Sequence, residues 1–466
     1  MPDEKWAFAS LPELGAQLRS GTATSVALTE FFLDRLERFG PRFGAVVTLT
    51  RELALEQAKQ ADADLKAGRD RGPLHGLPYG AKDLLATRGI PTTWGAAPLK
   101  DQVFDEDATV VVRLRDAGAV LAAKLSMIEL AGGFGYRQAN ASLSGPGRCA
   151  WDDTCWAGGS SSGPGSAVGA GLVPFAIGSE TSGSIMTPAA LNGITGMRPT
   201  YGLVSRHGAM ALSWTMDKLG PMGHSIEDCG LVLAAIAGPD PLDATSLADG
   251  YRYQPENVAD RKPRVGIIEG CLKTVEDEVR KNFEAAVEVY RQFAEVTEVK
   301  LPDLPYGAVV GTVISCEMAA AFETFIRDGQ AWELTAPEDR WGGHSTLAIP
   351  AKDYINALRV RRKIQIALDE LLSRFDALIA PTLATVAGPI DREFREWSRG
   401  FASSQLGVAA NVAGLPGASI PIGPGARGLP TGMQLVGRTL SENRLFGVAA
   451  EYQRRTEWHR RHPEIP

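Results

Sequence analysis

The sequence predicts an α/β fold, a large mixed sheet covered by helices, and two stretches of the chain carry that prediction. Residues 265–268 and 296–301 are short apolar runs typical of strands, and between them apolar side chains recur at helical spacing over 275–293. A charged helical stretch at 354–375 is likewise followed by the apolar run 377–380. Strands and helices that alternate in this way pack as a sheet with helices on its faces.

The N-terminal part of the chain predicts two helices. Ser10 and Glu13 match a capping box, with Pro12 in the first turn, so a helix is expected to begin after Ser10. A second helix carries apolar side chains at helical spacing, and Gly40 is expected to end it. The apolar positions of this second helix are Leu28, Phe32, Leu36 and Phe39.

The remaining strands are predicted from short apolar runs. A helical pattern that begins near Asp107 passes into a strand at 120–123, and residues 172–177 are expected to form a strand that leads to a segment rich in glycine and serine. Two further strands are expected at 419–422 and 433–436. These patterns predict the strands but not their order in the sheet.

The composition indicates a globular protein, and we expect one large domain spanning 1–466. The 466 residues are 44% apolar, which is enough to bury a large core, and 22% charged. No linker, repeat or low-complexity tract divides the chain. The net charge of −7 argues against a nucleic-acid partner. A monomer or a homodimer is expected.

The chain is predicted to act in the cytoplasm, without a membrane segment, metal ion or cofactor. Its start, Met1 to Trp6, lacks the basic and apolar stretches of a secretion signal. No run reaches the roughly 18 uninterrupted apolar residues that indicate a membrane-spanning helix. Five cysteines without a Cys-x-x-Cys pair fit free thiols in a reducing compartment and match no metal-site spacing.

Two segments rich in glycine and serine, 158–163 and 178–184, are candidate sites of chemistry. Glycine lets the backbone turn sharply and expose its N–H groups, and serine supplies a nucleophile or a proton carrier. Upstream, Lys82 follows the apolar run 77–81, which is typical of a strand end. Taken singly, the two segments equally fit turns and Lys82 fits a surface residue. Taken together, they indicate an acyl-transfer site.

Lys82 and the two segments resemble, in order and spacing, the amidase signature family, whose members use a Ser–cis-Ser–Lys triad. The resemblance covers nearly the whole chain and implies an α/β/α sandwich, with a signature core at about 75–240 and a variable substrate-entrance region at about 310–350. Five further segments are similar to family blocks: 195–202, 216–222, 376–382, 411–416 and 432–437.

The resemblance assigns a role to each of the candidate residues. It makes Ser184 the nucleophile, Ser160 the bridging serine and Lys82 the base that starts the proton relay. The peptide bond between Gly159 and Ser160 is expected to be cis. The oxyanion hole, which holds the charge of a tetrahedral intermediate, is expected to be built from the backbone N–H groups of Thr181, Ser182, Gly183 and Ser184.

Two residues depart from the common family pattern. Ser182 stands where many members have glycine, but a backbone donor needs only its N–H, so the oxyanion hole is expected to survive. Met186 stands where relatives that process glutamine often carry arginine. A thioether suits an apolar acyl or aryl group, whereas a substrate carboxylate would lose a bidentate guanidinium partner.

The substrate pocket is expected to combine Met186 with Ala131, Gly132 and Gly133. A loop-rich lid within 310–350 is expected to form its entrance, although ordinary packing is the commoner role for the aromatic residues that suggest it. Those lid residues are Phe322, Phe325, Trp332, Trp341 and the pair Gly342-Gly343.

Other catalytic motifs fit the sequence less well. Residues 159–163 match the G-x-S-x-G pattern of an α/β-hydrolase, with Ser161 as nucleophile, but the preceding segment 151–157 is predicted to be a polar and aromatic loop where a strand is required. No serine stands three places before a lysine, which excludes the S-x-x-K enzymes. A glycine-rich stretch at 163–169 contains proline and is only a weak match to a dinucleotide loop.

The sequence therefore predicts a free-standing serine amidohydrolase that acts on small-molecule substrates. Aryl amides and anilides are the expected substrates, with carbamates, urethanes and esters beside them. The alternative is a glutamine-dependent amidotransferase subunit that supplies ammonia to a partner protein. Met186 argues against that alternative.

Overall fold

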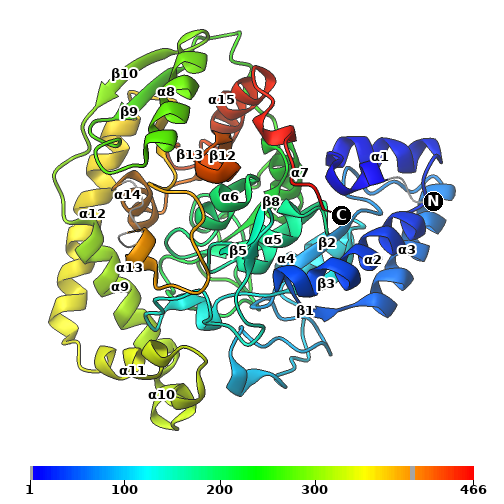
Figure 1. Cartoon of the computed structure of the whole chain (residues 1–466), viewed down its shortest axis with the longest axis horizontal. Coiled ribbons are helices and arrows are strands. Elements are labelled where there is room, and N and C mark those ends of the chain that lie inside the picture. Colours follow the sequence, from blue (N-terminus) through cyan, green and yellow to red (C-terminus); the bar gives the residue numbers. More distant parts are fainter. Residues whose placement is uncertain (1–3, 399–404, 466) are drawn as a thin grey trace.

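The computed structural model describes residues 4–398 and 405–465. Met1 to Asp3, part of the N-terminal stretch predicted to lack a secretion signal, lie outside the described residues. At the centre is an eleven-stranded sheet (Figure 1). Its strands, in spatial order, are β1 (Val46–Leu49), β3 (Val120–Leu125), β2 (Pro78–Lys82), β6 (Phe175–Glu180), β8 (Lys218–Gly223), β7 (Thr195–Arg198), β12 (Gly417–Pro424), β13 (Pro430–Val436), β11 (Ala377–Pro381), β9 (Arg264–Ile268) and β10 (Glu295–Val299).

The sheet is mixed, as predicted. Strand β2 runs parallel to β3 and β6, and β9 runs parallel to β10 and β11. The other neighbouring strands are antiparallel. Strand β12 connects the first and second halves of the chain within the sheet, because it pairs with β7 on one side and with β13 on the other.

Helices cover both faces of the sheet, which confirms the predicted α/β class. Successive strand side chains point to opposite faces, so Ile379 of β11 packs in one buried cluster and its neighbour Leu378 in another. Among the described helices, none is both long and apolar enough to cross a membrane. One face is covered by α1 (Leu11–Ser20), α4 (Thr109–Asp116), α7 (Ile226–Ile236), α8 (Asp277–Arg291) and α15 (Glu442–Arg454).

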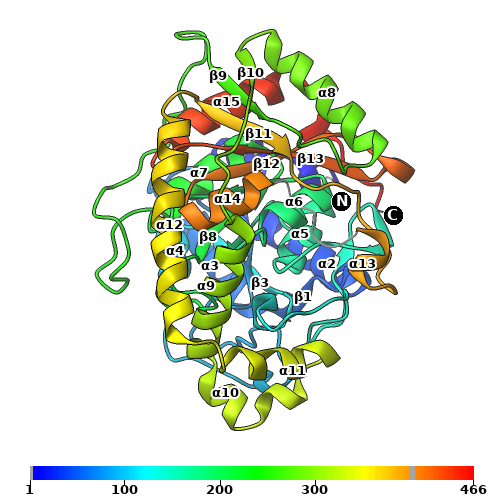
Figure 2. The ribbon, with the colours of Figure 1, turned by 90° about the vertical axis from the view of Figure 1, so that its left-hand side faces the viewer.

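The opposite face carries two groups of helices. The first group packs on the strands around β2 and β6. The second group consists of α9, α12 and α14, which lie side by side over β11 and β13 (Figure 2). Helices α10 (Glu323–Arg327) and α11 (Pro337–Thr346) lie together at one end of the molecule. The two groups comprise α3 (Arg51–Lys66), α5 (Ser162–Gly169) and α6 (Met186–Asn192), then α9 (Tyr306–Ala321), α12 (Ala351–Leu372) and α14 (Gln405–Ala413).

The two N-terminal helices form largely as predicted. The Ser10 side chain accepts a hydrogen bond from the Glu13 N–H and the Glu13 carboxylate accepts one from the Ser10 N–H, which completes the capping box of α1. Helix α2 (Ser25–Phe43) buries its predicted apolar stripe. The prediction that Gly40 ends α2 was wrong: the helix continues through Pro41, buries Phe43 completely, and ends at Gly44.

Replacing Gly44 with alanine is expected to lower the free energy of unfolding by about 1–2 kcal/mol. Gly44 has a φ of 56°, which disfavours any residue with a Cβ, and an added Cβ would lie 2.6 Å from the carbonyl oxygen of Pro146. Urea unfolding measures the change. Gly21, which ends α1 at a φ of 72° with open space around it, is the matched control. An equal loss at both positions would show that the Pro146 contact contributes nothing.

Strand β6 lies three residues later in the sequence than predicted. Residues 172–174 belong to the turn after α5, and the strand runs from Phe175 to Glu180. Its last residues, Ser179 and Glu180, pair with Leu219 and Lys218 of β8. Part of the predicted glycine- and serine-rich loop is therefore strand, and this strand holds two polar side chains at fixed positions in the core.

The segment before the first serine cluster also differs from its prediction. It was predicted to be a loop, but it contains β5 (Asp152–Trp156), which pairs with the short strand β4 (Arg148–Cys149). Cys155 and Trp156 are fully buried, so this small hairpin is held by side-chain packing. The aromatic and β-branched residues of 154–156 favour a strand, a signal that the polar Asp152 and Asp153 masked.

Candidate active site

Lys82 lies at the end of β2, in the middle of the sheet, with no exposed surface. Its Nζ donates hydrogen bonds to three hydroxyl oxygens, at 2.8 Å to Ser160, 3.0 Å to Ser161 and 2.9 Å to Ser179. The parallel pairing of β2 with β6 brings Lys82 beside Ser179. No carboxylate among the described residues forms an ion pair with this amine.

The surroundings of Lys82 favour its neutral form. Burial lowers the pKa of Lys82 to about 7, and the more distant charges of Asp217 and Glu180 oppose that shift only in part. An ordinary lysine is almost fully protonated at pH 7, whereas the lowered pKa of Lys82 makes its neutral form accessible there. This lysine can therefore accept a proton from a hydroxyl at neutral pH.

Ser160 and Ser161 begin the segment that leads into α5. The peptide bond between Gly159 and Ser160 is cis, as the family resemblance implied. Ser161 is fully buried, and its Oγ donates to the carbonyl oxygen of Ser179. Its N–H donates to the carbonyl oxygen of Ser184 at 3.2 Å, which fixes the two serine segments against each other.

Ser184 lies in the turn between β6 and α6. Gly183, with a φ of 92°, allows this turn, and a Cβ there would contact only Thr187, so the backbone angle and not the space requires glycine. No described residue accepts a hydrogen bond from the N–H groups of Ser182, Gly183 or Ser184. These three donors are thus available to a bound group.

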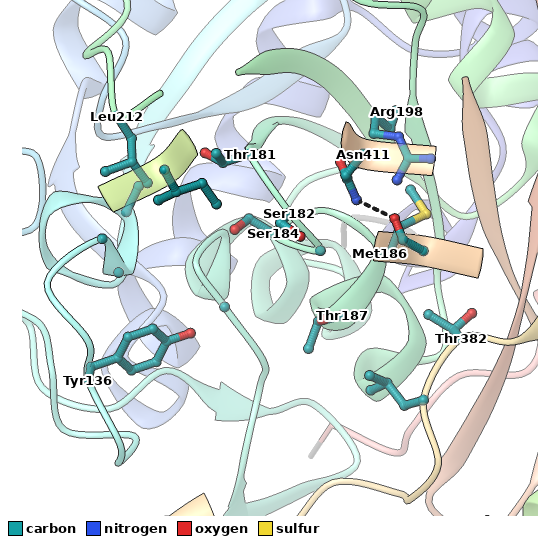
Figure 3. Close-up of a pocket in the computed structure, with 18 of the residues that line it drawn as sticks. Tyr136, Thr181, Ser182, Ser184, Met186, Thr187, Arg198, Leu212, Thr382 and Asn411 are labelled. Carbon is teal, nitrogen blue, oxygen red and sulfur yellow. Dashed lines mark hydrogen bonds between the residues drawn. The ribbon is translucent and has the colours of Figure 1, made fainter. Parts of the chain in front are cut away.

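A cavity of about 320 Å³ opens directly above this turn (Figure 3). All the residues predicted for the oxyanion hole and for the substrate pocket line it, namely Thr181, Ser182, Gly183, Ser184, Ala131, Gly132, Gly133 and Met186. Lys82 and Ser160 lie beneath the lining, next to Gly159, which borders the cavity. The structure therefore brings together every predicted site residue, in two layers.

A buried polar cluster closes the cavity at the Met186 end. The carboxylate of Glu180 accepts hydrogen bonds from the N–H groups of Ile185 and Met186, at 2.8 and 3.0 Å, and pairs with Arg198 at 2.6 Å. Asn411 of α14 donates to the same carboxylate at 2.9 Å and accepts from Lys218 at 3.0 Å. Glu180 thus anchors the start of α6, directly after the turn that contains Ser184.

The charges of this cluster compensate one another. Burial alone would raise the pKa of Glu180, but Arg198 and Lys218 outweigh it and lower that pKa to about 2. Burial, together with the charge of Arg198, brings the pKa of Lys218 well below its ordinary value. The ion pair between Glu180 and Arg198 is therefore the charged centre of this end of the cavity.

Sequence reasoning missed several of these residues. Ser161 and Ser179 stand inside the two serine segments, but their contact with Lys82 depends on the pairing of β2 and β6, which the sequence does not reveal. Arg198 and Asn411 belong to the family-like segments 195–202 and 411–416, and a polar residue within an otherwise apolar block was the available signal. Their role at the cavity could not be read from that signal alone.

The structure does not contain the loop-rich lid that was predicted within 310–350. Residues 310–350 are mainly helical, in α9, α10 and α11, and of this region Ile314 alone is among the described residues that line the cavity. Phe322 and Phe325 are buried against Phe134, as expected from ordinary packing. Trp332 and Trp341 pack edge to face at 4.3 Å on the outside, with 41% and 68% of their surface exposed. The pair Gly342-Gly343 lies tightly against Phe134.

The geometry also bears on the rival hydrolase motif. Although a strand does precede residues 159–163, Ser161 is completely buried beneath the cavity and bonded to Lys82 and Ser179. Of the described residues that line the cavity, none is histidine. Ser161 is thus not placed as the nucleophile of a serine–histidine site.

A buried lysine joined to serine hydroxyls, below a cavity at the end of a central strand, defines an α/β enzyme of the amidase type. The profile of the Amidase family matches residues 27–446, so the chain belongs to that family. Enzymes of this family act on carbon–nitrogen bonds.

Individual relatives are found along the whole chain. It is 37% identical, over 491 residues, to the A subunit of glutamyl-tRNA(Gln) amidotransferase of Aromatoleum aromaticum (strain DSM 19018 / LMG 30748 / EbN1), covering 98% of this chain and 99% of that protein. The native peptide amidase from Stenotrophomonas maltophilia has a similar structure, with a TM-score of 0.84, 33% identity and coverage of 97% and 98%. The A subunit of glutamyl-tRNA(Gln) amidotransferase from Thermotoga maritima superposes with a TM-score of 0.80 at 26% identity, covering 98% and 96%.

Proposed function

We propose that this chain is a free-standing serine amidohydrolase that cleaves amide bonds, aryl amides and anilides above all, through an acyl-enzyme on Ser184. The observation that carries the proposal is the buried amine of Lys82, whose hydrogen-bond partners among the described residues are three serine hydroxyls, Ser160 among them. By the same acyl transfer it would cleave carbamates, urethanes and esters. One catalytic domain, without cofactor, is sufficient for this chemistry.

The proposed reaction starts with a proton relay. Lys82 takes the proton of the Ser160 hydroxyl while Ser160 takes that of Ser184, and the Ser184 oxygen attacks the carbonyl carbon. The negative oxygen that forms is held by the backbone N–H groups of residues 181–184. The proton then returns through Ser160 to the nitrogen, which leaves as an amine. Water, activated by the same relay, releases the acid and restores Ser184.

The purified chain is expected to release para-nitroaniline from an acyl anilide, and Ser184→Ala should lower that rate by at least about 10⁴-fold. The reason is that the substitution removes the proposed nucleophile but leaves the backbone N–H groups of the turn in place. Ser373→Ala, which changes an exposed serine bonded to the Glu370 carbonyl, is the control. Full activity in Ser184→Ala would refute the assignment of the nucleophile.

The second candidate is an amidotransferase subunit that supplies ammonia from glutamine to a partner protein, and the relatives that are named as amidotransferase subunits favour it. Met186 argues against it, and the guanidinium of Arg198 at the same end of the cavity is already paired with Glu180. Ammonia release from glutamine decides between the two. Hydrolysis of anilides by the isolated chain, with glutamine untouched, supports the amidohydrolase; activity on glutamine alone supports the amidotransferase.

A further inference from the structure

The end of the cavity around Met186 contains one buried donor that the fold leaves unused. Arg198 is fully buried and lines the cavity. Its Nε donates to the carbonyl oxygen of Leu415 at 3.0 Å and its Nη1 to Glu180 at 2.6 Å, but its Nη2 has no hydrogen-bond partner among the described residues. A buried guanidinium nitrogen without a partner is costly, so a bound group is expected to supply the acceptor.

The neighbouring polar side chains at this end are already engaged. Asn411 is bonded to Glu180, Gly407 and Lys218, and the Thr382 hydroxyl to that of Ser419. Gln434 donates to the carbonyl oxygen of Pro381. In Figure 3, Arg198, Asn411, Met186 and Thr382 lie at one end of the cavity and Tyr136 at the other. Nη2 of Arg198 is thus a buried nitrogen at the Met186 end that lacks a hydrogen-bond partner among the described residues.

Glycine at position 417 lets this nitrogen lie close to β12 without a clash. Gly417 of β12 pairs with Arg198 across the sheet, and a Cβ at 417 would lie 2.7 Å from Nη2. Arg198 and Ser184 line the same cavity, and the carboxylate of Glu180 binds both the guanidinium and the N–H groups of Ile185 and Met186, the two residues after Ser184. An acyl chain of a few carbons therefore reaches from Ser184 to Arg198.

We propose that this end of the cavity is an acyl subsite in which Arg198 Nη2 donates to a neutral carbonyl oxygen near the end of the substrate's acyl group. The positive charge of Arg198 is already balanced by Glu180, and the same carboxylate would repel an anionic substituent. The preferred substrates are accordingly amides whose acyl part itself ends in a carboxamide. This subsite rests on the proposed function, because it orients the acyl group that Ser184 attacks.

The test compares three para-nitroanilides with acyl groups of similar length: succinamoyl, succinyl and butanoyl. The wild-type chain should cleave the succinamoyl compound with a kcat/KM about tenfold above that of the butanoyl compound, the size expected for a hydrogen bond to a charged donor. The succinyl compound, which ends in a carboxylate, should lie below the succinamoyl one. A butanoyl or succinyl compound cleaved as well as the succinamoyl compound would overturn the proposal.

Two variants probe the donor itself. Arg198→Lys keeps a cation beside Glu180 but loses the second arm of the fork, so the preference for the succinamoyl compound should disappear. Gly417→Ala keeps the arginine but places a Cβ 2.7 Å from Nη2, so the guanidinium must shift, and the same ratio should fall. Arg444→Lys is the matched control, since Arg444 is also buried and paired with a carboxylate, that of Asp376, but does not line the cavity. A ratio unchanged in both test variants would refute the role of Nη2.

A binding measurement separates this inference from the proposed reaction. If none of the anilides is hydrolysed, the proposed function fails, and the acyl subsite is then judged by calorimetric binding of the same compounds to Ser184→Ala. Tighter binding of the succinamoyl compound that is lost in the double variant with Arg198→Lys supports the subsite. Equal binding of the succinamoyl and butanoyl compounds refutes it.

Discussion

Replacing Lys82 with methionine is expected to lower kcat/KM for an acyl anilide by about 10³-fold, because the proton relay loses its only amine. Methionine has nearly the same length and fills the same space without titrating. Lys124→Met is the matched control: Lys124 lies in the neighbouring strand β3, is equally buried, and pairs with Asp83 at 3.2 Å, and neither residue lines the cavity. Activity retained in Lys82→Met would exclude Lys82 as the base.

The pH dependence of kcat/KM provides an independent check on Lys82. The base must be neutral, and burial lowers the pKa of Lys82 to about 7, so the rate should rise with pH through about 7 and level off above it. The residual rate of Lys82→Met should lack this rise. A wild-type rate that is flat between pH 6 and 8 would contradict the assignment.

The same substitution should raise the stability of the protein at pH 7. An unfolded lysine has a pKa near 10.5, whereas folding lowers that of Lys82 to about 7, so between these values the unfolded state binds more protons and stability rises with pH. Below pH 7 the buried lysine therefore lowers the free energy of unfolding, and methionine removes that cost. Lys124→Met should instead lower the melting temperature, since it leaves the buried Asp83 carboxylate without its partner.

Glu180→Gln is expected to lower the free energy of unfolding by about 3–5 kcal/mol, the usual loss when one partner of a buried ion pair is removed. The substitution leaves the Arg198 guanidinium without a counter-charge and weakens the anchoring of Ile185 and Met186. Urea unfolding measures the loss. Glu256→Gln is the control, since Glu256 pairs with Arg444 but is half exposed, and should cost less than about 1 kcal/mol.

Lowering the pH should reduce the difference in the free energy of unfolding between the wild type and Glu180→Gln. The pKa of Glu180 is about 2 in the folded protein and near 4.5 when unfolded, so its charge contributes stability above pH 4.5 that is lost as the pH falls toward 2. The two unfolding curves should approach each other over that interval. A constant difference from pH 6 to pH 3 would show that the charge of Glu180 is not what stabilises the protein.

More of the candidate site than of the fold could be predicted from the sequence. Lys82, Ser160 and Ser184 could be proposed from the sequence because a lysine followed by two segments rich in glycine and serine resembles the pattern of a known family. The strand order could not, because the pairing of β7 with β12 joins residues more than two hundred positions apart. For the same reason nothing in the sequence indicated that Ser179 lies beside Lys82.

Local errors came from features whose outcome depends on tertiary packing. Gly40 and Gly44 are equally plausible helix ends in the sequence, and the burial of Phe43 decides between them. The aromatic residues of 310–350 gave no sign of whether they lie on loops or helices. A charge such as that of Arg198 is informative only once its partners are known, since its unused nitrogen is a property of the assembled core.

The position of β12 has a consequence for how the enzyme is made. Arg198 donates a hydrogen bond to the carbonyl oxygen of Leu415, and Glu180 accepts one from Asn411. Residues in the first half of the chain therefore depend on partners in its last fifth. During synthesis the serine turn emerges from the ribosome long before these partners, and contacts so distant in sequence form late and slowly. Shortened or stalled chains should therefore carry an unfinished, inactive site, and hydrolytic activity should appear only when translation of the chain is nearly complete.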